Sequence, residues 1–240
     1  MNRPRTDEVA ATLVPNWTTP PTNLRLAPTD LHLWLLDTTQ TAQPPDPTPL
    51  SADEQARAAR VSRDSARRRF IRTRAWQRQI LGAYLQLDPA SVPLARGPKG
   101  KPFIDLPDTD LRFNLSHSGD LALLAAMRGR DIGVDLERQD ERRDLQRIAA
   151  RMFPADWAAD LAASPPARRT GLFHAYWTRL EAGVKAHGGG LFASTDGTGG
   201  NEFRHFTPQA GYLGCVAVRG RCPPPGRWRF FRFDADADSL

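Results

Sequence analysis

The segment RDIGVDLERQ, residues 130–139, carries two acidic side chains in a pattern suited to metal chemistry. Its apolar residues alternate with glycine and acidic residues, which is the period-two pattern of a half-buried strand. Asp135 and Glu137 would therefore point to one side of that strand, about 6.6 Å apart along it. Neighbouring carboxylates repel each other, so we expect a divalent cation opposite Asp135 and Glu137.

A third carboxylate lies in a predicted helix, residues 167–187, whose apolar spacing is the strongest in the chain. Within its WTRLEAGVKA portion, Glu181 and Lys185 stand one turn apart, beside the apolar stripe rather than on it. Packed near the strand, this helix would add Glu181 to the ligands Asp135 and Glu137. Magnesium, or manganese in its place, prefers oxygen ligands of this kind and keeps substrate phosphates in its shell.

The segment FNLSHSGD, residues 113–120, places Ser116 and His117 in a predicted turn between two strands. His117 and Lys185 would then face phosphate groups held by the same cation. Each feature also has an ordinary structural interpretation: a solvated strand face, an exposed ion pair on a helix and a serine-rich turn. The order and spacing of the three segments, rather than any one of them, favour an active site.

The formal net charge is +6 and the isoelectric point is about 10.0. This balance suits a polyanionic partner: nucleic acid, an anionic cofactor or an acidic protein. No apolar run approaches the roughly 20 residues that span a bilayer, and the two cysteines are too few for a disulfide scaffold or a zinc site. We therefore expect a cytoplasmic protein without a membrane segment.

The chain divides by composition into a tail and two halves. Residues 1–23 are rich in Thr and Pro, which indicates a mobile tail. Residues 24–128 and 129–240 each show strands and helices, with the boundary near 128–131. In the first half, Ser51 is the expected N-cap of an arginine-rich helical region that is broken near residues 61–62 and ends near residue 87.

The ordered motifs GKPF, FNLSHSGD, GVDLE and WTRLEAGVKA resemble those of the 4′-phosphopantetheinyl transferase superfamily, of the surfactin-synthetase-activating (Sfp-like) type. The resemblance covers about residues 24–218. One position departs from the family pattern, since Leu180 stands where a lysine usually precedes the helix glutamate. Leu180 continues the apolar stripe of its helix, so the fold does not require the lysine.

The resemblance implies an α+β fold with pseudo-twofold symmetry, in which each half packs helices on a small antiparallel sheet. The active site would lie in the cleft between the halves, with the coenzyme A site in the first half and the magnesium and catalytic residues in the second. The implied reaction moves the 4′-phosphopantetheine group of coenzyme A to a serine of an acidic carrier protein and releases adenosine 3′,5′-bisphosphate. Such enzymes serve polyketide, nonribosomal peptide or fatty acid synthesis, and a monomer is expected.

The resemblance also implies roles for individual residues. Asp135, Glu137 and Glu181 would hold magnesium. Glu181 would also be the general base, and Asp135 and Lys185 would complete the catalytic group. The expected coenzyme A contacts are Arg63, Arg78, Gln79, Lys99, Gly100, Lys101, Pro102, Ser116, His117 and Lys185, with Arg78 the first choice for the 3′-phosphate.

Three alternatives stay open from the residues. The arginine-rich helix and the charge would suit a nucleic-acid-binding protein, although that leaves the three carboxylates unexplained. A different magnesium-dependent phosphohydrolase would use the same acidic pair without any carrier protein. An inactive homologue acting in assembly is the third, suggested by Leu180 alone.

Overall fold

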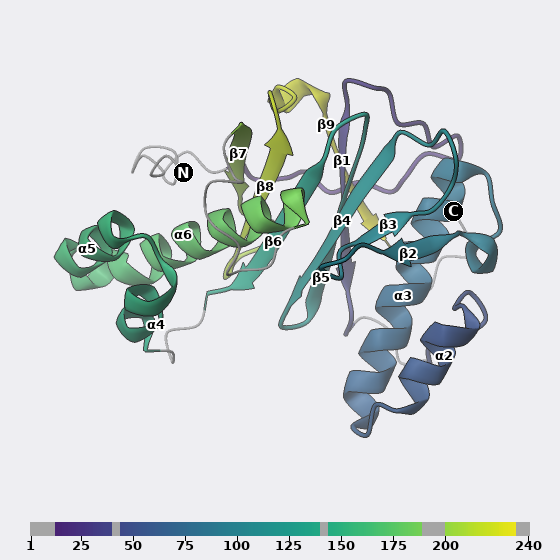
Figure 1. The fold of residues 1–240 in the computed structure, drawn as a ribbon, viewed down its shortest axis with the longest axis horizontal. Coiled ribbons are helices and arrows are strands. Elements are labelled where there is room, and N and C mark those ends of the chain that lie inside the picture. The colour runs from purple at the N-terminus through teal and green to yellow at the C-terminus, as the bar shows by residue number, and fades with distance from the viewer. Residues whose placement is uncertain (1–12, 40–43, 140–143, 189–199, 234–240) are drawn as a thin grey trace.

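The computed structural model describes residues 13–39, 44–139, 144–188 and 200–233. It consists of two similar halves, each with a long helix packed on a small sheet (Figure 1). The two helices, α3 (Asp64–Leu85) and α6 (Pro166–His187), each contain 22 residues. The prediction of an α+β fold built from two halves is confirmed.

The first half is a four-stranded sheet covered by α3. Its strands, in the order β4-β5-β1-β9, are Leu111–Ser118, Leu121–Arg128, Leu31–Asp37 and Trp228–Phe233. β1 runs antiparallel to β5 and parallel to β9. A short hairpin of β2 (Leu94–Arg96) and β3 (Pro102–Ile104) lies beside this sheet, and α2 (Ala52–Ala59) lies beside α3. Ser51 caps α2 as predicted, because its hydroxyl accepts the backbone N–H of Glu54.

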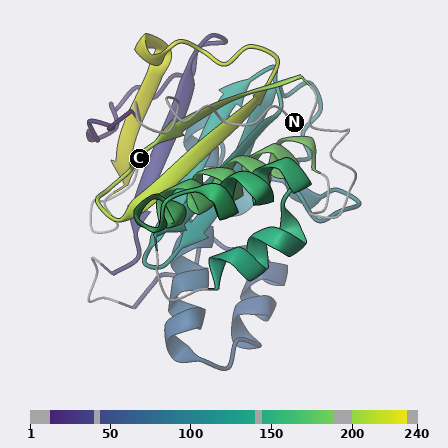
Figure 2. The same cartoon turned by 90° about the vertical axis from the view of Figure 1, so that its left-hand side faces the viewer.

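The second half is a three-stranded antiparallel sheet with α6 on one face. Its strands, in the order β6-β8-β7, are Ile132–Arg138, Tyr212–Arg219 and Asn201–Phe206. Two shorter helices, α4 (Leu145–Met152) and α5 (Ala155–Ala163), pack against the first part of α6. Figure 2 shows these three helices together on one side of the strands, with α2 and α3 below.

The strands alternate between two sets of neighbours, and this alternation joins the halves. Leu31, Leu33 and Leu35 of β1 enter a core that also contains side chains of β5, β6, β8 and β9. Trp34 and Leu36, at the alternate positions of the strand, face α3 instead. The two sheets therefore share one hydrophobic core, and each long helix covers the outer face of its own sheet.

Two predictions about domain organisation are wrong in part. The strand β9 lies beyond residue 129 in sequence, yet it pairs with β1 in the sheet of the first half. Residues 13–23 do not form a free tail: Trp17 donates a hydrogen bond from Nε1 to the carbonyl of Pro208 at 2.8 Å, and the backbone N–H of Thr18 bonds to the carbonyl of Phe230 at 3.0 Å. Apolar residues among the threonines and prolines account for this anchoring, since Leu13 and Trp17 pack on the shared core. Residues 1–12 lie outside the described residues.

A buried polar group links β1 to α3. The indole N–H of Trp34 donates to Tyr84 Oη at 2.9 Å, so the hydroxyl proton is available for Nδ1 of His32, 2.6 Å away. The hydroxyl can donate to Nδ1 when the imidazole is neutral and carries its proton on the other ring nitrogen. Burial lowers the pKa of His32 to about 4, and Asp30 only partly opposes this.

We expect His32 to make the fold sensitive to mild acid. The folded pKa lies below the value of 6.5 for a free imidazole, so between pH 6.5 and 4 the unfolded chain binds a proton that the folded chain does not. Stability from this source is complete above pH 6.5 and decreases by about 3 kcal/mol as the pH falls to 4. Urea titrations of the wild type and of His32→Asn across this range measure it.

Asparagine keeps an acceptor near the position of Nδ1 but does not titrate. His32→Asn should therefore lose stability less steeply with acid than the wild type. The carboxylates contribute equally to the acid sensitivity of both proteins, so they do not affect this comparison. Equal slopes for the two proteins would contradict the assignment of a neutral His32.

Candidate active site

The acidic segment forms strand β6, and its alternation places both carboxylates toward α6. Leu136 and its apolar neighbours enter the shared core, whereas Gly133, Asp135 and Glu137 lie on the opposite face. Gly133 allows the helix to approach the strand closely, since a Cβ there would lie 2.0 Å from the carbonyl oxygen of Ala182. This contact sets the distance between the carboxylates of β6 and the side chains of α6.

Asp135 is the buried centre of the site, with 3 % of its surface exposed. Its Oδ1 accepts hydrogen bonds from Lys185 Nζ at 2.6 Å and from the hydroxyl of Ser116 at 2.9 Å. Its Oδ2 is buried and has no hydrogen-bond partner among the described residues. Burial raises the pKa of Asp135 to about 7, Lys185 opposes the shift, and Glu137 and Glu181 add to it.

Glu137 and Glu181 flank Asp135 from the strand and from the helix. The indole N–H of Trp177 donates to Glu137 Oε1 at 3.0 Å, and the hydroxyl of Ser118 donates to Oε2 at 2.9 Å. Partial burial raises the pKa of Glu181, with Lys185 opposing and Glu137 adding to the shift. Glu137 and Glu181 are therefore close enough to Asp135 to influence its pKa.

A finished metal-binding group is not present in this arrangement. Among the residues that the structure describes, no three His, Cys, Asp or Glu side chains are gathered closely enough to hold an ion. The predicted convergence of three carboxylates in one coordination sphere is thus not seen, and Lys185 is paired with Asp135 instead. The unpaired Oδ2 of Asp135 is nevertheless an oxygen donor of the kind that magnesium binds.

His117 lies in strand β4, not in the predicted turn, which falls at the next two residues after Ser118. Strand pairing with β5 continues through Ser118, so the serines on either side of His117 belong to the strand and not to the turn. Partial burial lowers the pKa of His117, and Lys185, Arg69 and Arg74 lower it further. His117 is therefore surrounded by positive charge, which favours a bound anion.

Arg78 has a structural position and does not support the predicted phosphate contact. Its side chain is 3 % exposed and donates from Nε to Glu54 at 2.5 Å. Its Nη1 donates to the carbonyls of Pro89, Ala90 and Val92. Arg78 thus ties α2 and α3 to the turn that precedes β2, a role that its sequence position alone does not reveal.

A cavity of about 320 Å³ lies between α2, α3 and the β2–β3 hairpin, and its charged lining consists of Arg57, Arg74, Arg78, Arg96, Asp53 and Glu54. Arg57 and Arg74 each lie over the ring of Phe70, with 5.6 Å from guanidinium carbon to ring centroid, and Arg96 lies opposite on β2. Burial lowers the pKa of Arg74, Glu54 opposes this shift, and the neighbouring arginines lower the pKa further. The arginines outnumber the carboxylates in this cavity, and the excess of positive charge favours a phosphate. Arg57, Arg74 and Arg96 were not among the predicted contacts, because arginine is frequent throughout this region and no local pattern singles them out.

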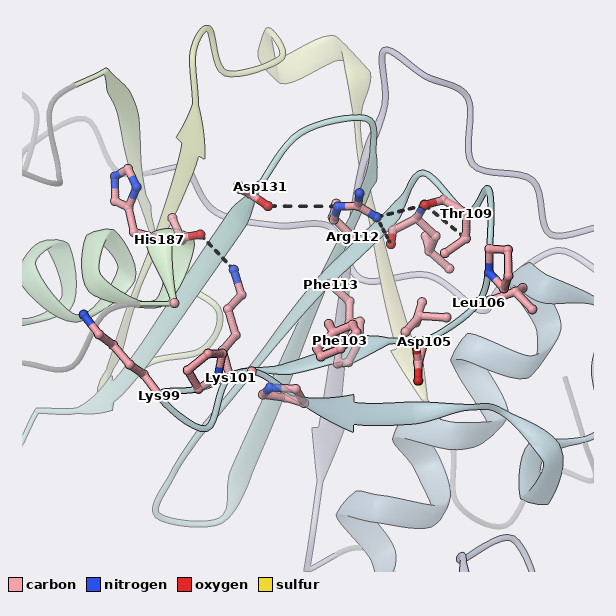
Figure 3. A pocket seen from close by; sticks show the side chains of 18 residues that line it. Lys99, Lys101, Phe103, Asp105, Leu106, Thr109, Arg112, Phe113, Asp131 and His187 are labelled. Carbon is pink, nitrogen blue, oxygen red and sulfur yellow. Dashed lines mark hydrogen bonds and ion pairs between the residues drawn. The ribbon is translucent and has the colours of Figure 1, made fainter.

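The hairpin loop holds the remaining predicted contacts, and Lys101 there joins the two halves. Its Nζ donates to the carbonyls of Ala186 at 2.8 Å and Ile132 at 3.3 Å, as Figure 3 shows for the end of α6. Lys99 lies exposed in the wall of a second cavity of about 720 Å³, which contains none of the three carboxylates. Pro102 lines both cavities, and Gly100 has a φ of 84°, which suits glycine.

Arg63 and Gln79 are not brought to either cavity. Arg63 is exposed at the start of α3, where its side chain makes no capping hydrogen bond. Leu180 packs with Phe153 and Tyr176 in the cluster under α4 and α5, as its apolar stripe predicts.

Comparisons with known proteins agree with this arrangement of halves. Residues 48–129 match the profile of the 4′-phosphopantetheinyl transferase N-terminal domain, and residues 131–220 match that of the 4′-phosphopantetheinyl transferase superfamily. The chain is 38 % identical over 180 residues to the 4′-phosphopantetheinyl transferase HetI of Nostoc sp., covering 73 % of this chain and 76 % of that protein. It is 33 % identical over 163 residues to a putative 4′-phosphopantetheinyl transferase of Synechocystis sp., covering 67 % and 65 %. It is 39 % identical over 105 residues to AcpT of Salmonella typhi, covering 42 % and 54 %.

The acidic strand β6 faces the Glu–Lys segment of α6 in a fold of two halves, and the two halves match two profiles of one kind of protein. The chain belongs to the 4′-phosphopantetheinyl transferase superfamily. The predictions of this family and of an enzyme that transfers phosphopantetheine to carrier proteins are thereby confirmed. Within the described ranges, no helix has the length and apolar character needed to cross a membrane.

We expect Gly133→Ala to be strongly destabilising. Its new methyl group would lie 2.0 Å from the carbonyl oxygen of Ala182 and 2.4 Å from the backbone nitrogen of Ala186, so α6 must move away from β6. Overpacking against backbone costs about 3 kcal/mol or more of the free energy of unfolding, which urea denaturation measures.

Gly171→Ala is the matched control, because it makes the same chemical change on α6 where no atom lies within 4 Å. It should increase the stability by about 0.5–1 kcal/mol, the usual gain for alanine over glycine in a helix. Equal effects of the two substitutions would contradict the close approach at Gly133.

Proposed function

We propose that this chain transfers the 4′-phosphopantetheine group of coenzyme A to a serine of an apo carrier protein, with a divalent cation, and that it is of the surfactin-synthetase-activating type. The observation that carries the proposal is the buried Asp135, whose Oδ2 has no partner among the described residues while Glu137 and Glu181 lie beside it. A buried carboxylate oxygen without a partner is costly unless a ligand completes it.

The unpartnered Oδ2 of Asp135 is an oxygen donor of the kind that magnesium or manganese binds, although the three carboxylates are not yet gathered around one point. Asp135, Glu137 and Glu181 would hold the ion, and Lys185 supplies part of the balancing charge when no ion is bound. Bound there, the ion would neutralise the negative charge that develops on the leaving phosphate as the bond between the bridging oxygen and the β-phosphorus breaks.

Glu181 is the proposed general base. The raised pKa of Glu181 makes its carboxylate more basic than an exposed glutamate. In the reaction the carrier serine oxygen forms a bond to the β-phosphorus, and its proton passes to Glu181. The bond from that phosphorus to the bridging oxygen breaks, and adenosine 3′,5′-bisphosphate leaves.

Lys185 and His117 would bind the pyrophosphate. Lys185 is about one-quarter exposed (28 %) although its Nζ contacts Asp135, so its ammonium can also meet a phosphate oxygen. His117 adds a ring in surroundings made positive by Lys185, Arg69 and Arg74. Together they orient the phosphorus that the serine attacks.

The cavity of Arg57, Arg74 and Arg96 is the proposed site of the 3′-phosphate, in place of the sequence-based choice of Arg63 and Arg78. Arginine forks match phosphate oxygens well, and a bound phosphate would relieve the repulsion among these arginines. Lys99, Gly100 and Pro102 stay proposed contacts for the rest of the nucleotide, whereas Lys101 is occupied by backbone carbonyls.

The proposed partner is an acidic carrier domain of polyketide, nonribosomal peptide or fatty acid synthesis. The formal net charge of +6 would speed the encounter with such a domain, and salt would weaken this electrostatic attraction. This explains the charge without nucleic acid. A monomer in the cytoplasm is part of the same proposal.

We expect Asp135→Asn and Glu181→Gln to abolish transfer. Both substitutions keep the shape of the side chain but remove the charge that would hold the ion, and Glu181→Gln also removes the base. Transfer should fall by about a hundredfold or more. Incubation with coenzyme A, magnesium and apo carrier proteins, followed by intact mass spectrometry of the carrier, measures it.

Asp131→Asn is the matched control, since this aspartate directly precedes the same strand but pairs with Arg112 and Arg219 at the surface. It should label the carrier at the wild-type rate, and a chelator should stop labelling by both proteins. If Asp135→Asn labels as fast as Asp131→Asn, the site assignment is wrong. Phosphate release from small esters without a carrier would favour the phosphohydrolase instead.

We expect Arg96→Ala to weaken the binding of coenzyme A through its 3′-phosphate. Loss of one charged hydrogen bond of about 1.5–3 kcal/mol should raise the KM for coenzyme A by about tenfold or more. The KM for 3′-dephospho-coenzyme A should be the same for the variant and the wild type. Transfer rates with the two substrates measure this difference.

Arg63→Ala provides the control, because Arg63 is exposed and lies outside the arginine cavity. It should leave both KM values unchanged. The opposite result, with Arg63→Ala selective against coenzyme A and Arg96→Ala neutral, would restore the sequence-based assignment.

A further inference from the structure

Strands β4 and β6 are edge strands of different sheets, and polar side chains connect them. Three side chains of β4 accept backbone N–H groups of β6: Asn114 Oδ1 from Val134 at 2.9 Å, Ser116 Oγ from Leu136 at 3.3 Å and Ser118 Oγ from Arg138 at 3.0 Å. The acceptors lie two residues apart, and so do the donors. We call these three contacts the β4–β6 ladder.

The serines of this ladder are bound in a way that fixes the direction of their protons. A hydroxyl has one proton to donate and two lone pairs. Ser116 Oγ accepts from Leu136 N and from Lys185 Nζ at 3.1 Å, so its proton must go to Asp135 Oδ1. Ser118 Oγ accepts from Arg138 N, and its proton goes to Glu137 Oε2 at 2.9 Å.

Each serine therefore contacts one acidic side chain of β6. It also contacts the backbone N–H of the residue that follows that acidic residue in β6. The backbone contact fixes the serine relative to β6, and the fixed serine in turn restricts the rotation of the carboxylate. Trp177 holds the second oxygen of Glu137 from the helix side. The two acidic side chains of β6 are thus oriented by the first half of the molecule, to which β4 belongs.

We propose that Ser116 and Ser118 are positioning residues for the cation site, so that the first half of the chain sets the metal affinity of the second. The inference rests on the proposed function, because it assumes that Asp135 and Glu137 hold the ion. It assigns the serines of the SHS motif a role other than contact with coenzyme A. Partners of ligating carboxylates commonly change metal affinity by 10- to 100-fold when removed.

Ser118→Ala tests the proposal with the least disturbance, since Ser118 is only partly buried and Arg138 is exposed. The probe is Mn²⁺ alone, with no coenzyme A or carrier, followed by the electron paramagnetic resonance signal of the free ion. We expect about tenfold weaker Mn²⁺ binding by Ser118→Ala. The melting temperature without metal should stay within about 2 °C of the wild type.

Ser118→Thr keeps the hydroxyl and should restore most of the affinity. Ser164→Ala is the control for loss of one serine hydrogen bond, because its Oγ donates to the carbonyl of Asp160 at the end of α5; it should bind Mn²⁺ like the wild type. In transfer assays, Ser118→Ala should need more metal for half-maximal rate but approach the wild-type rate at saturation.

Two outcomes separate this inference from the proposed function. Wild-type binding of Mn²⁺ with an unchanged affinity in Ser118→Ala would overturn the inference alone. A wild-type protein that takes up no Mn²⁺, but labels carriers in the presence of a chelator, would overturn both the metal site and the role of the serines.

Discussion

The charge on Asp135 is the constraint on which the rest of the site depends. A carboxylate with 3 % exposure has lost nearly all of its water, and burial of an isolated charge is strongly unfavourable. Lys185 and Ser116 compensate one oxygen and leave the other unpaired. Three features compensate this buried charge: the closely packed helix α6, the polar face of β4 and the nearby basic side chains.

Compensation of that charge requires both halves of the molecule. Lys185 comes from α6 of the second half, whereas Ser116 comes from β4 of the first. Lys101 adds a further connection, since its ammonium binds carbonyls at the start of β6 and at the end of α6. The relative position of the halves is therefore fixed by polar contacts around the site as well as by the shared hydrophobic core.

The sequence predicted features that depend on local periodicity or on capping. The alternation in β6, the cap at Ser51 and the apolar position of Leu180 all follow from side-chain type and spacing. It did not predict contacts made between distant segments. Arg78 is buried and bound to a turn eleven to fourteen residues away. Arg96 is exposed beside the same cavity, and nothing in their neighbouring residues distinguishes the two.

The parallel pairing of β9 with β1 has a consequence for how the chain folds during synthesis. Strand β1 is an inner strand of its sheet, yet one of its two neighbours is the last strand described, residues 228–233. When only the first 130 residues have left the ribosome, one edge of the largely apolar strand β1 is therefore unpaired. Folding of the first half is completed only after the second half has been translated, so the two halves mature together rather than one after the other.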